Sequence, residues 1–157
     1  MSAAPFTAPL QGLPDPDLDR QFYDGVVGRR LFAWVADVAL VLLAGVPVAA
    51  LFGLLTLGFG FALFPAIVAG IAFAYRTLTL AGASATWGMR FAGIEFRRHD
   101  GTRFDGVTAL VHTAISAVCL GFFVLQLVSC ATILGSRHRQ SLADMLLGTT
   151  AINRPAE

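Results

Sequence analysis

The chain has 157 residues, of which 56% are hydrophobic and only 13% carry a charge. A soluble domain ordinarily has about 25% charged residues, so this composition excludes an ordinary soluble protein and also a disordered one. The net charge of +1 gives no concentrated basic surface for nucleic acid, and we expect no nucleic-acid partner. The sequence therefore predicts a small integral membrane protein whose first partner is the lipid bilayer.

The first 28 residues are polar and are interrupted by prolines. Such a segment cannot bury much apolar surface, so we expect residues 1–28 to form a flexible tail. Residues 29–153 form the predicted membrane domain. A second short tail is expected at 154–157.

An uncharged stretch runs from Val38 to Tyr75, which is about twice the 20 or so residues that one membrane-spanning helix needs. Gly58 and Gly60 lie near its middle, where glycines allow a tight turn. We therefore expect a hairpin of two transmembrane helices. These two predicted spans cover about 31–55 and 61–80.

Small residues recur every four positions along the second predicted span, at Ala62, Ala66, Gly70 and Ala74. Such a stripe lets another helix backbone approach closely in lipid. We expect it to pack against a helix. The alternative is a ligand groove along the same face.

Arginines outnumber acidic residues between the second span and the next apolar block. An alternation of apolar and polar residues at 94–97 is followed by Asp100–Gly101, which favours a β-hairpin. We expect a small extramembrane hairpin at about 91–104. The excess of arginine predicts that this hairpin and the N-terminus lie in the cytoplasm.

A second uncharged block covers about 106–136. As one helix it would measure about 46 Å against a hydrocarbon core of about 30 Å, yet it is too short for two full spans. Arginines follow the block, and 148–153 resembles a strand that would pair with the cytoplasmic hairpin. We therefore expect a bent or re-entrant block that turns near Gly121. The alternative is one long tilted span with the C-terminus outside.

The predicted fold is an all-α membrane protein with a small appended sheet. Two transmembrane helices and a third hydrophobic helical block carry a cytoplasmic β-hairpin, which the C-terminal strand joins. Cys119 and Cys130 are about 16 Å apart if the third block is helical, too far for a disulfide. We expect both to be buried thiols without a metal site.

Three motifs resemble those of the RDD family of bacterial membrane proteins, which is named for one arginine and two aspartates. The opening motif matches Arg30–Asp37, the central loop matches 85–101, and the closing motif with the second aspartate, Asp144, matches 139–149. The resemblance covers about residues 22–153. Family members often carry a basic residue early in the third hydrophobic block, where this chain has His112.

The resemblance implies a multi-pass protein of the bacterial inner membrane. The biochemical function of the family is largely unassigned, although some members have been linked to cation/proton exchange. The family therefore implies a fold and a location more than a mechanism.

Asp37 is the most informative single residue because it lies about two helical turns below Arg30. A carboxylate in lipid costs several kcal/mol unless it has a partner. We expect an ion-pair cluster at the cytoplasmic end, made of Arg30, Asp37, Asp144 and one of Arg76 or Arg139. The preferred role is to hold the helices together. An ion or proton pathway through Asp37 and a partner-binding role are the alternatives.

His112 belongs to a polar stripe on one face of the third block. We expect it to make interhelical hydrogen bonds. A proton relay is the main alternative, because histidine titrates near neutral pH. No pair of histidines has metal-ligand spacing, and we expect neither a metal nor a cofactor.

The sequence contains no phosphate-binding loop, nucleophile elbow, zinc motif or magnesium-binding carboxylate set, and we expect no enzymatic activity. The favoured function is an accessory or adaptor subunit that docks onto a larger membrane protein or forms a homo-oligomer. The alternative is a cation/proton-coupled transporter that acts as an oligomer, with Asp37 as the ion-carrying carboxylate. The adaptor is preferred because charged residues lie near the predicted membrane ends and do not line a path across it.

Overall fold

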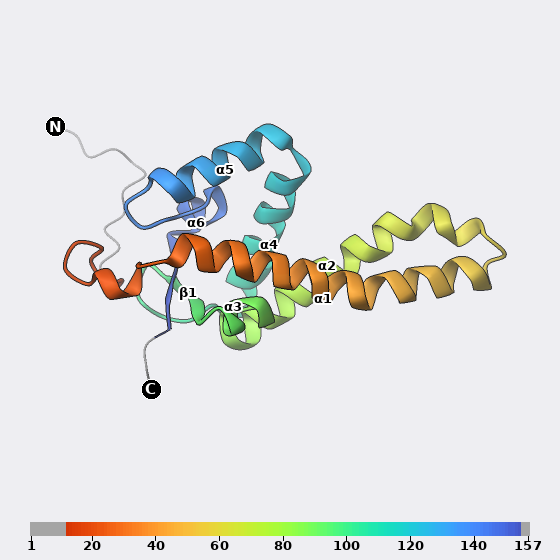
Figure 1. The fold of residues 1–157 in the computed structure, drawn as a ribbon, viewed down its shortest axis with the longest axis horizontal. Helices are drawn as coiled ribbons and strands as arrows, with labels where there is room; N and C mark the ends of the chain where they lie inside the picture. Colours follow the sequence, from red (N-terminus) through yellow and green to blue (C-terminus); the bar gives the residue numbers. More distant parts are fainter. Residues whose placement is uncertain (1–11, 155–157) are drawn as a thin grey trace.

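A long helical hairpin dominates the fold, as Figure 1 shows. Helix α1 covers Val26–Leu55 and helix α2 covers Phe64–Ala83, with the short 3-10 helix η2, Phe59–Leu63, between them. This computed structural model describes residues 12–154. By length and hydropathy both helices are able to cross a membrane, so the two predicted spans are confirmed as helices.

The turn between α1 and α2 lies at Gly58 and Gly60, as predicted from the sequence. Leu57 and Gly58 both adopt a left-handed backbone, with φ of 53° and 98°. Glycine carries no steric penalty there. The Thr56 hydroxyl accepts the Gly60 N–H at 2.7 Å and closes the turn.

The third hydrophobic block consists of helix α4, Gly106–Gly121, and helix α5, Phe123–Gly135. The chain direction changes by 117° between them, which confirms the predicted bend. At about 24 Å and 20 Å, each helix alone is shorter than a hydrocarbon core. In Figure 1, α5 returns from the bend toward the end of the molecule that holds α6.

The remaining elements gather at the end of the hairpin opposite η2, which we call the sheet end (Figure 1). They are η1 (Arg20–Phe22), α3 (Trp87–Phe91), β1 (Ile94–Arg98), α6 (Leu142–Leu147) and β2 (Thr149–Asn153). β1 and β2 form an antiparallel two-stranded sheet in which Phe96 pairs with Ala151. The prediction that the C-terminal strand joins the central segment is confirmed.

The predicted β-hairpin at 91–104 is wrong in its second strand, because β1 pairs with β2 and Thr102 starts no strand. The Asp100 carboxylate accepts hydrogen bonds from the Thr102 N–H at 2.9 Å and from the Thr102 hydroxyl at 2.6 Å. The Gly101 N–H also donates to the Arg98 carbonyl at 2.8 Å. In this tight turn the Thr102 N–H and the Arg98 carbonyl already have partners, so they are not available for pairing with a second strand.

The described part of the predicted N-terminal tail, residues 12–28, is packed on the sheet end. The Tyr23 side chain is buried, and the Asn153 amide donates to the Gln21 and Asp24 carbonyls at 2.8 Å and 2.9 Å. We expected this segment to be flexible. Instead, one aromatic ring and several carbonyl groups within residues 12–28 have partners at the sheet end, and these contacts hold the segment in place. The rest of the two predicted tails, 1–11 and 155–157, lies outside the described residues.

The buried core lies at the sheet end and not along the hairpin. Its members include Val26, Leu80, Met89, Ile94, Phe96 and Phe104. Beyond it, α1 and α2 expose large apolar side chains such as Leu55, which is 74% exposed. An apolar surface this extensive is typical of a protein surrounded by lipid. Cys119 is buried but Cys130 is exposed, so the expectation of two buried thiols is wrong for Cys130.

Candidate functional site

Asp144 lies in α6 and is completely buried at the sheet end. Ser141 starts this helix with a capping box, in which its Oγ accepts the Asp144 N–H at 3.3 Å. In return, Asp144 Oδ2 accepts the Ser141 N–H at 2.9 Å. The local sequence Ser-x-x-Asp therefore fixes the carboxylate in place.

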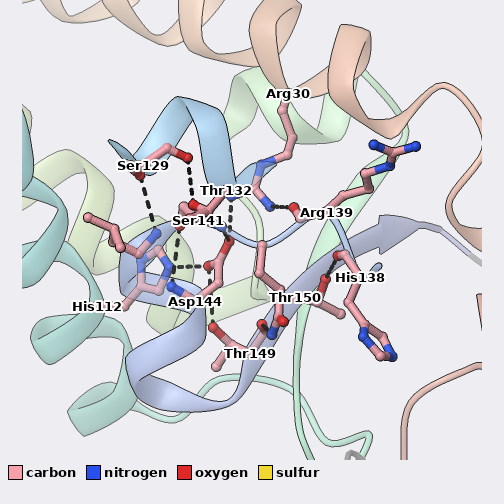
Figure 2. Close-up of polar contacts among 12 residues, drawn as sticks. Arg30, His112, Ser129, Thr132, His138, Arg139, Ser141, Asp144, Thr149 and Thr150 are labelled. Carbon is pink, nitrogen blue, oxygen red and sulfur yellow. Dashed lines mark hydrogen bonds and ion pairs between the residues drawn. The ribbon is translucent and has the colours of Figure 1, made fainter. Parts of the chain in front are cut away.

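Arg30 of α1 forms an ion pair with this carboxylate, as Figure 2 shows. Its Nη2 donates to Asp144 Oδ2 at 2.6 Å, and its Nη1 donates to the Arg139 carbonyl at 3.1 Å. The guanidinium also lies over the Phe96 ring, 5.4 Å from the centroid. One arginine thus connects α1 to the loop before α6, to α6 itself and to β1.

His112 of α4 completes the Asp144 site (Figure 2). Its Nε2 lies 2.7 Å from Asp144 Oδ1, and the Thr149 hydroxyl donates to the same oxygen at 3.3 Å. The imidazole is buried against the rings of Phe96 and Phe104. Its Nδ1 has no hydrogen-bond partner within residues 12–154.

The charge of Asp144 is set by opposing effects. Burial alone would raise the pKa of this carboxyl, but the Arg30 guanidinium, the His112 ring and the Ser141 N–H outweigh burial and hold the pKa below its usual range. Asp144 is therefore ionised at neutral pH and neutralises the Arg30 charge inside the protein.

Asp37 of α1 forms a second and separate site. Its Oδ1 accepts the Tyr75 hydroxyl at 2.6 Å and the Gly88 N–H at 2.8 Å. Its Oδ2 accepts the Thr86 hydroxyl at 2.6 Å. All three donors are neutral, and none of the ion pairs within residues 12–154 includes Asp37. This carboxylate ties α1 to α2 and α3.

Helix α3 reaches Asp37 because of its first residues. Thr86 caps the helix by accepting the Met89 N–H at 3.2 Å. A Cβ at Gly88 would collide with the Ala33 carbonyl oxygen and with the Asp37 carboxylate. Only glycine permits this approach, so the Thr-Trp-Gly sequence is what places donors on Asp37.

The structure divides the predicted ion cluster into these two sites. It brings Arg30, Asp144 and His112 together and holds Asp37 apart. Arg139 contributes its backbone carbonyl, while its side chain donates to the Leu134 carbonyl and points away from Asp144 (Figure 2). Arg76 belongs to neither site by hydrogen bonding, since its buried Nε has no partner within residues 12–154.

Sequence reasoning missed the groups that bind the two aspartates. Ser141 carried a readable signal, because Ser-x-x-Asp before an apolar run is a capping-box pattern. Thr86 carried a weaker capping signal. Tyr75 and Gly88 carried none, because their partner lies far away along the chain.

The family model of the RDD family matches residues 25–148. The chain belongs to the RDD family. No curated protein and no solved structure shows significant similarity to it. The match includes Arg30, Asp37 and Asp144, the residues that resemble the arginine and two aspartates of the family name. Family membership and the apolar helices together indicate that this RDD protein is a membrane protein.

Proposed function

We propose that this RDD protein is an accessory or adaptor subunit that docks through α2 onto a transmembrane helix of a larger membrane protein. The carrying observation is the small-residue face of α2. Its four members, Ala62, Ala66, Gly70 and Ala74, are all exposed. A Cβ at Gly70 would meet nothing within 4 Å. The face is therefore open to the close backbone approach that drives helix association in lipid.

The two buried carboxylates support an anchoring role for the rest of the domain. Both oxygens of Asp37 and both of Asp144 already accept hydrogen bonds from the protein. A carboxylate that carries an ion must release such partners and regain them. Groups bound this completely hold elements in place, and so they favour a docking platform over a carrier.

A photo-crosslinking amino acid in place of Ala66, in the full chain and in native membranes, tests the docking face. We expect an adduct with a membrane protein that Gly70→Leu abolishes, because leucine fills the contact surface. Gly82→Leu is the matched control, since Gly82 lies on the same helix, also faces open space and points about 120° away. An adduct unaffected by Gly70→Leu, or an uncrosslinked monomer alone, would overturn the proposal. An adduct between two copies would replace the larger partner with a homo-oligomer.

The second candidate is cation/proton-coupled transport by an oligomer, with Asp37 as the carrying carboxylate and His112 as a relay. One observation favours it, namely the buried His112 Nδ1, which has no partner within the described residues and lies on the ring that contacts Asp144. Purified protein in liposomes should then show cation-driven proton flux that Asp37→Asn removes. Flux no greater than that of empty liposomes would eliminate this candidate.

We further propose that the sheet end faces the cytoplasm of a bacterial inner membrane, with α4 and α5 entering and leaving on that side. The arginine excess of this end supports the orientation. In a variant without the native cysteines, His99→Cys should resist an impermeant reagent added to right-side-out cells, whereas Phe59→Cys at the hairpin tip should react. Labelling of His99→Cys from outside would reverse the orientation.

A further inference from the structure

A buried carboxylate with three arginines lies on the sheet, apart from both aspartate sites. Glu95 of β1 is completely buried. Arg97 forms a close ion pair with it, Arg154 Nε lies 3.5 Å from its Oε2, and Arg103 Nη2 lies 3.7 Å from the same oxygen. One negative charge therefore faces three positive charges, and the cluster retains a net charge of about +2.

The three arginines are not equally engaged. Arg97 donates from Nε and Nη2 to Glu95 and from Nη1 to the Gly101 carbonyl. Arg103 and Arg154 make no hydrogen bond through their side chains within residues 12–154, and these side chains are 52% and 41% exposed. Each guanidinium carries five N–H donors in a planar fork that matches phosphate oxygens. The guanidinium groups of Arg103 and Arg154 therefore have N–H donors available for a ligand, and the negative charge of Glu95 holds both groups in place.

The cluster also lies close to the apolar part of the molecule. The Arg154 N–H donates to the Gly93 carbonyl at 2.9 Å, and Arg29 at the start of α1 donates to the neighbouring Ala92 carbonyl at 2.9 Å. Helix α3, just before these residues, exposes Trp87 and Phe91. Exposed aromatic residues at the end of apolar helices are typical of the headgroup layer.

We propose that Arg103 and Arg154 bind the phosphate of an anionic phospholipid headgroup at this boundary. A zwitterionic headgroup offers the same phosphate but adds a quaternary ammonium, which a cluster of net charge +2 disfavours. The site is separate from the small-residue face of α2, so its test and the test of the docking function succeed or fail independently.

Native mass spectrometry of the full chain in detergent tests the site, with phosphatidylglycerol and phosphatidylcholine of the same acyl chains as probes. We expect wild-type protein to prefer phosphatidylglycerol. The double variant Arg103→Gln/Arg154→Gln should lose roughly ten- to thirtyfold in affinity for it, since each arginine near an anionic surface contributes a factor of about five. The fold should survive because Arg97 still neutralises Glu95, and thermal unfolding in detergent checks this.

The matched control is Arg98→Gln/Arg137→Gln, which removes the same two charges from arginines that Asp105, Asp15 and Asp17 already neutralise. This control should bind phosphatidylglycerol like the wild type. Equal binding of the two lipids, or full binding by the Arg103/Arg154 variant, would overturn the assignment. Displacement of the lipid by inorganic phosphate at the same concentration would also overturn it, because the ligand would then be a free anion.

Discussion

Asp144 accepts a hydrogen bond from a charged guanidinium, whereas Asp37 accepts only from neutral groups, although both carboxylates are buried and belong to the same family pattern. Asp144 joins α6 to α1 and α4, and its charge is compensated by Arg30. Asp37 joins α1 to α2 and α3 through two hydroxyls and one N–H.

The two sites differ in the partner groups that remain when a neutral side chain replaces the aspartate. At Asp144 the loss of charge leaves the largely buried Arg30 guanidinium without its ion-pair partner, which is a costly state. At Asp37 a neutral side chain of the same shape is able to satisfy most of the same donors. The two sites therefore predict different responses to substitution, and five experiments test this comparison.

The largest effect is expected from Asp144→Ala. It removes the Arg30 partner, the His112 partner and half of the α6 capping box, and should lower the free energy of unfolding by about 3–5 kcal/mol. Denaturant unfolding in detergent measures this. Asp19→Ala is the control, because the Asp19 side chain makes no hydrogen bond within residues 12–154, and it should have little effect.

A double-mutant cycle separates the ion pair from the cap. Arg30→Met should recover part of the loss when it is combined with Asp144→Asn, because both charges are then absent. Strict additivity of the two single effects would mean that Arg30 and Asp144 are not coupled.

The second effect is steric and belongs to the Asp37 site. In Gly88→Ala the new Cβ collides with the Ala33 backbone and displaces the Gly88 N–H from Asp37, for a loss of about 1–3 kcal/mol. In Gly82→Ala the Cβ enters open space within α2, so stability should rise by up to about 1 kcal/mol. Thermal unfolding of the two variants shows whether each substitution lowers or raises the unfolding temperature. Equal changes in the two variants would contradict the close contact between α1 and α3.

The long apolar elements were the most predictable part of the fold. Both spans and the glycine turn at Gly58 follow from length and glycine position, which are local properties of the sequence. The bend near Gly121 was inferred from the length of the block, from the arginines that follow it and from the strand-like segment 148–153. The pairing of the C-terminal strand with the central segment was predicted, but the lack of a second strand after the turn was not, because the local signal of Asp100–Gly101 indicates a turn but not which strand pairs across it. That choice depends on β2, which arrives about 55 residues later and buries Ala151 and Ile152.

Of the candidate site, Arg30, Asp37 and Asp144 were predictable, but their pairing and the neutral groups that bind the two aspartates were not. Arg30 and Asp37 share α1, and the sequence alone places them near one another. However, seven residues correspond to about 10 Å along the axis, and Asp144 arrives from another element to within 2.6 Å of Arg30. The donors that bind Asp37 come from α2 and α3, so only tertiary structure brings them there.

The third effect separates the two aspartates directly. Asp37→Asn should cost about 1 kcal/mol, because its amide oxygen still accepts from Tyr75 and Gly88 and its amide N–H donates to the Thr86 oxygen. Asp144→Asn should cost more, because it leaves the Arg30 charge uncompensated. Thermal unfolding of both variants in one detergent tests the order. A reversed order would show that the charge of Asp37 contributes more to stability than that of Asp144.

The smallest effect is the acid response of the Asp144 site. Because the pKa of Asp144 is lowered in the folded protein, the folded state binds fewer protons than the unfolded state, where the pKa is about 3.9. Its contribution to stability is therefore complete above about pH 5 and falls as the pH drops further, by about 1 kcal/mol between pH 4 and pH 3. The difference in unfolding free energy between wild type and Asp144→Asn should be constant from pH 7 to about pH 5 and shrink below pH 4. If the wild-type advantage over Asp144→Asn stayed constant down to pH 3, the pKa of Asp144 would not be lowered in the folded protein.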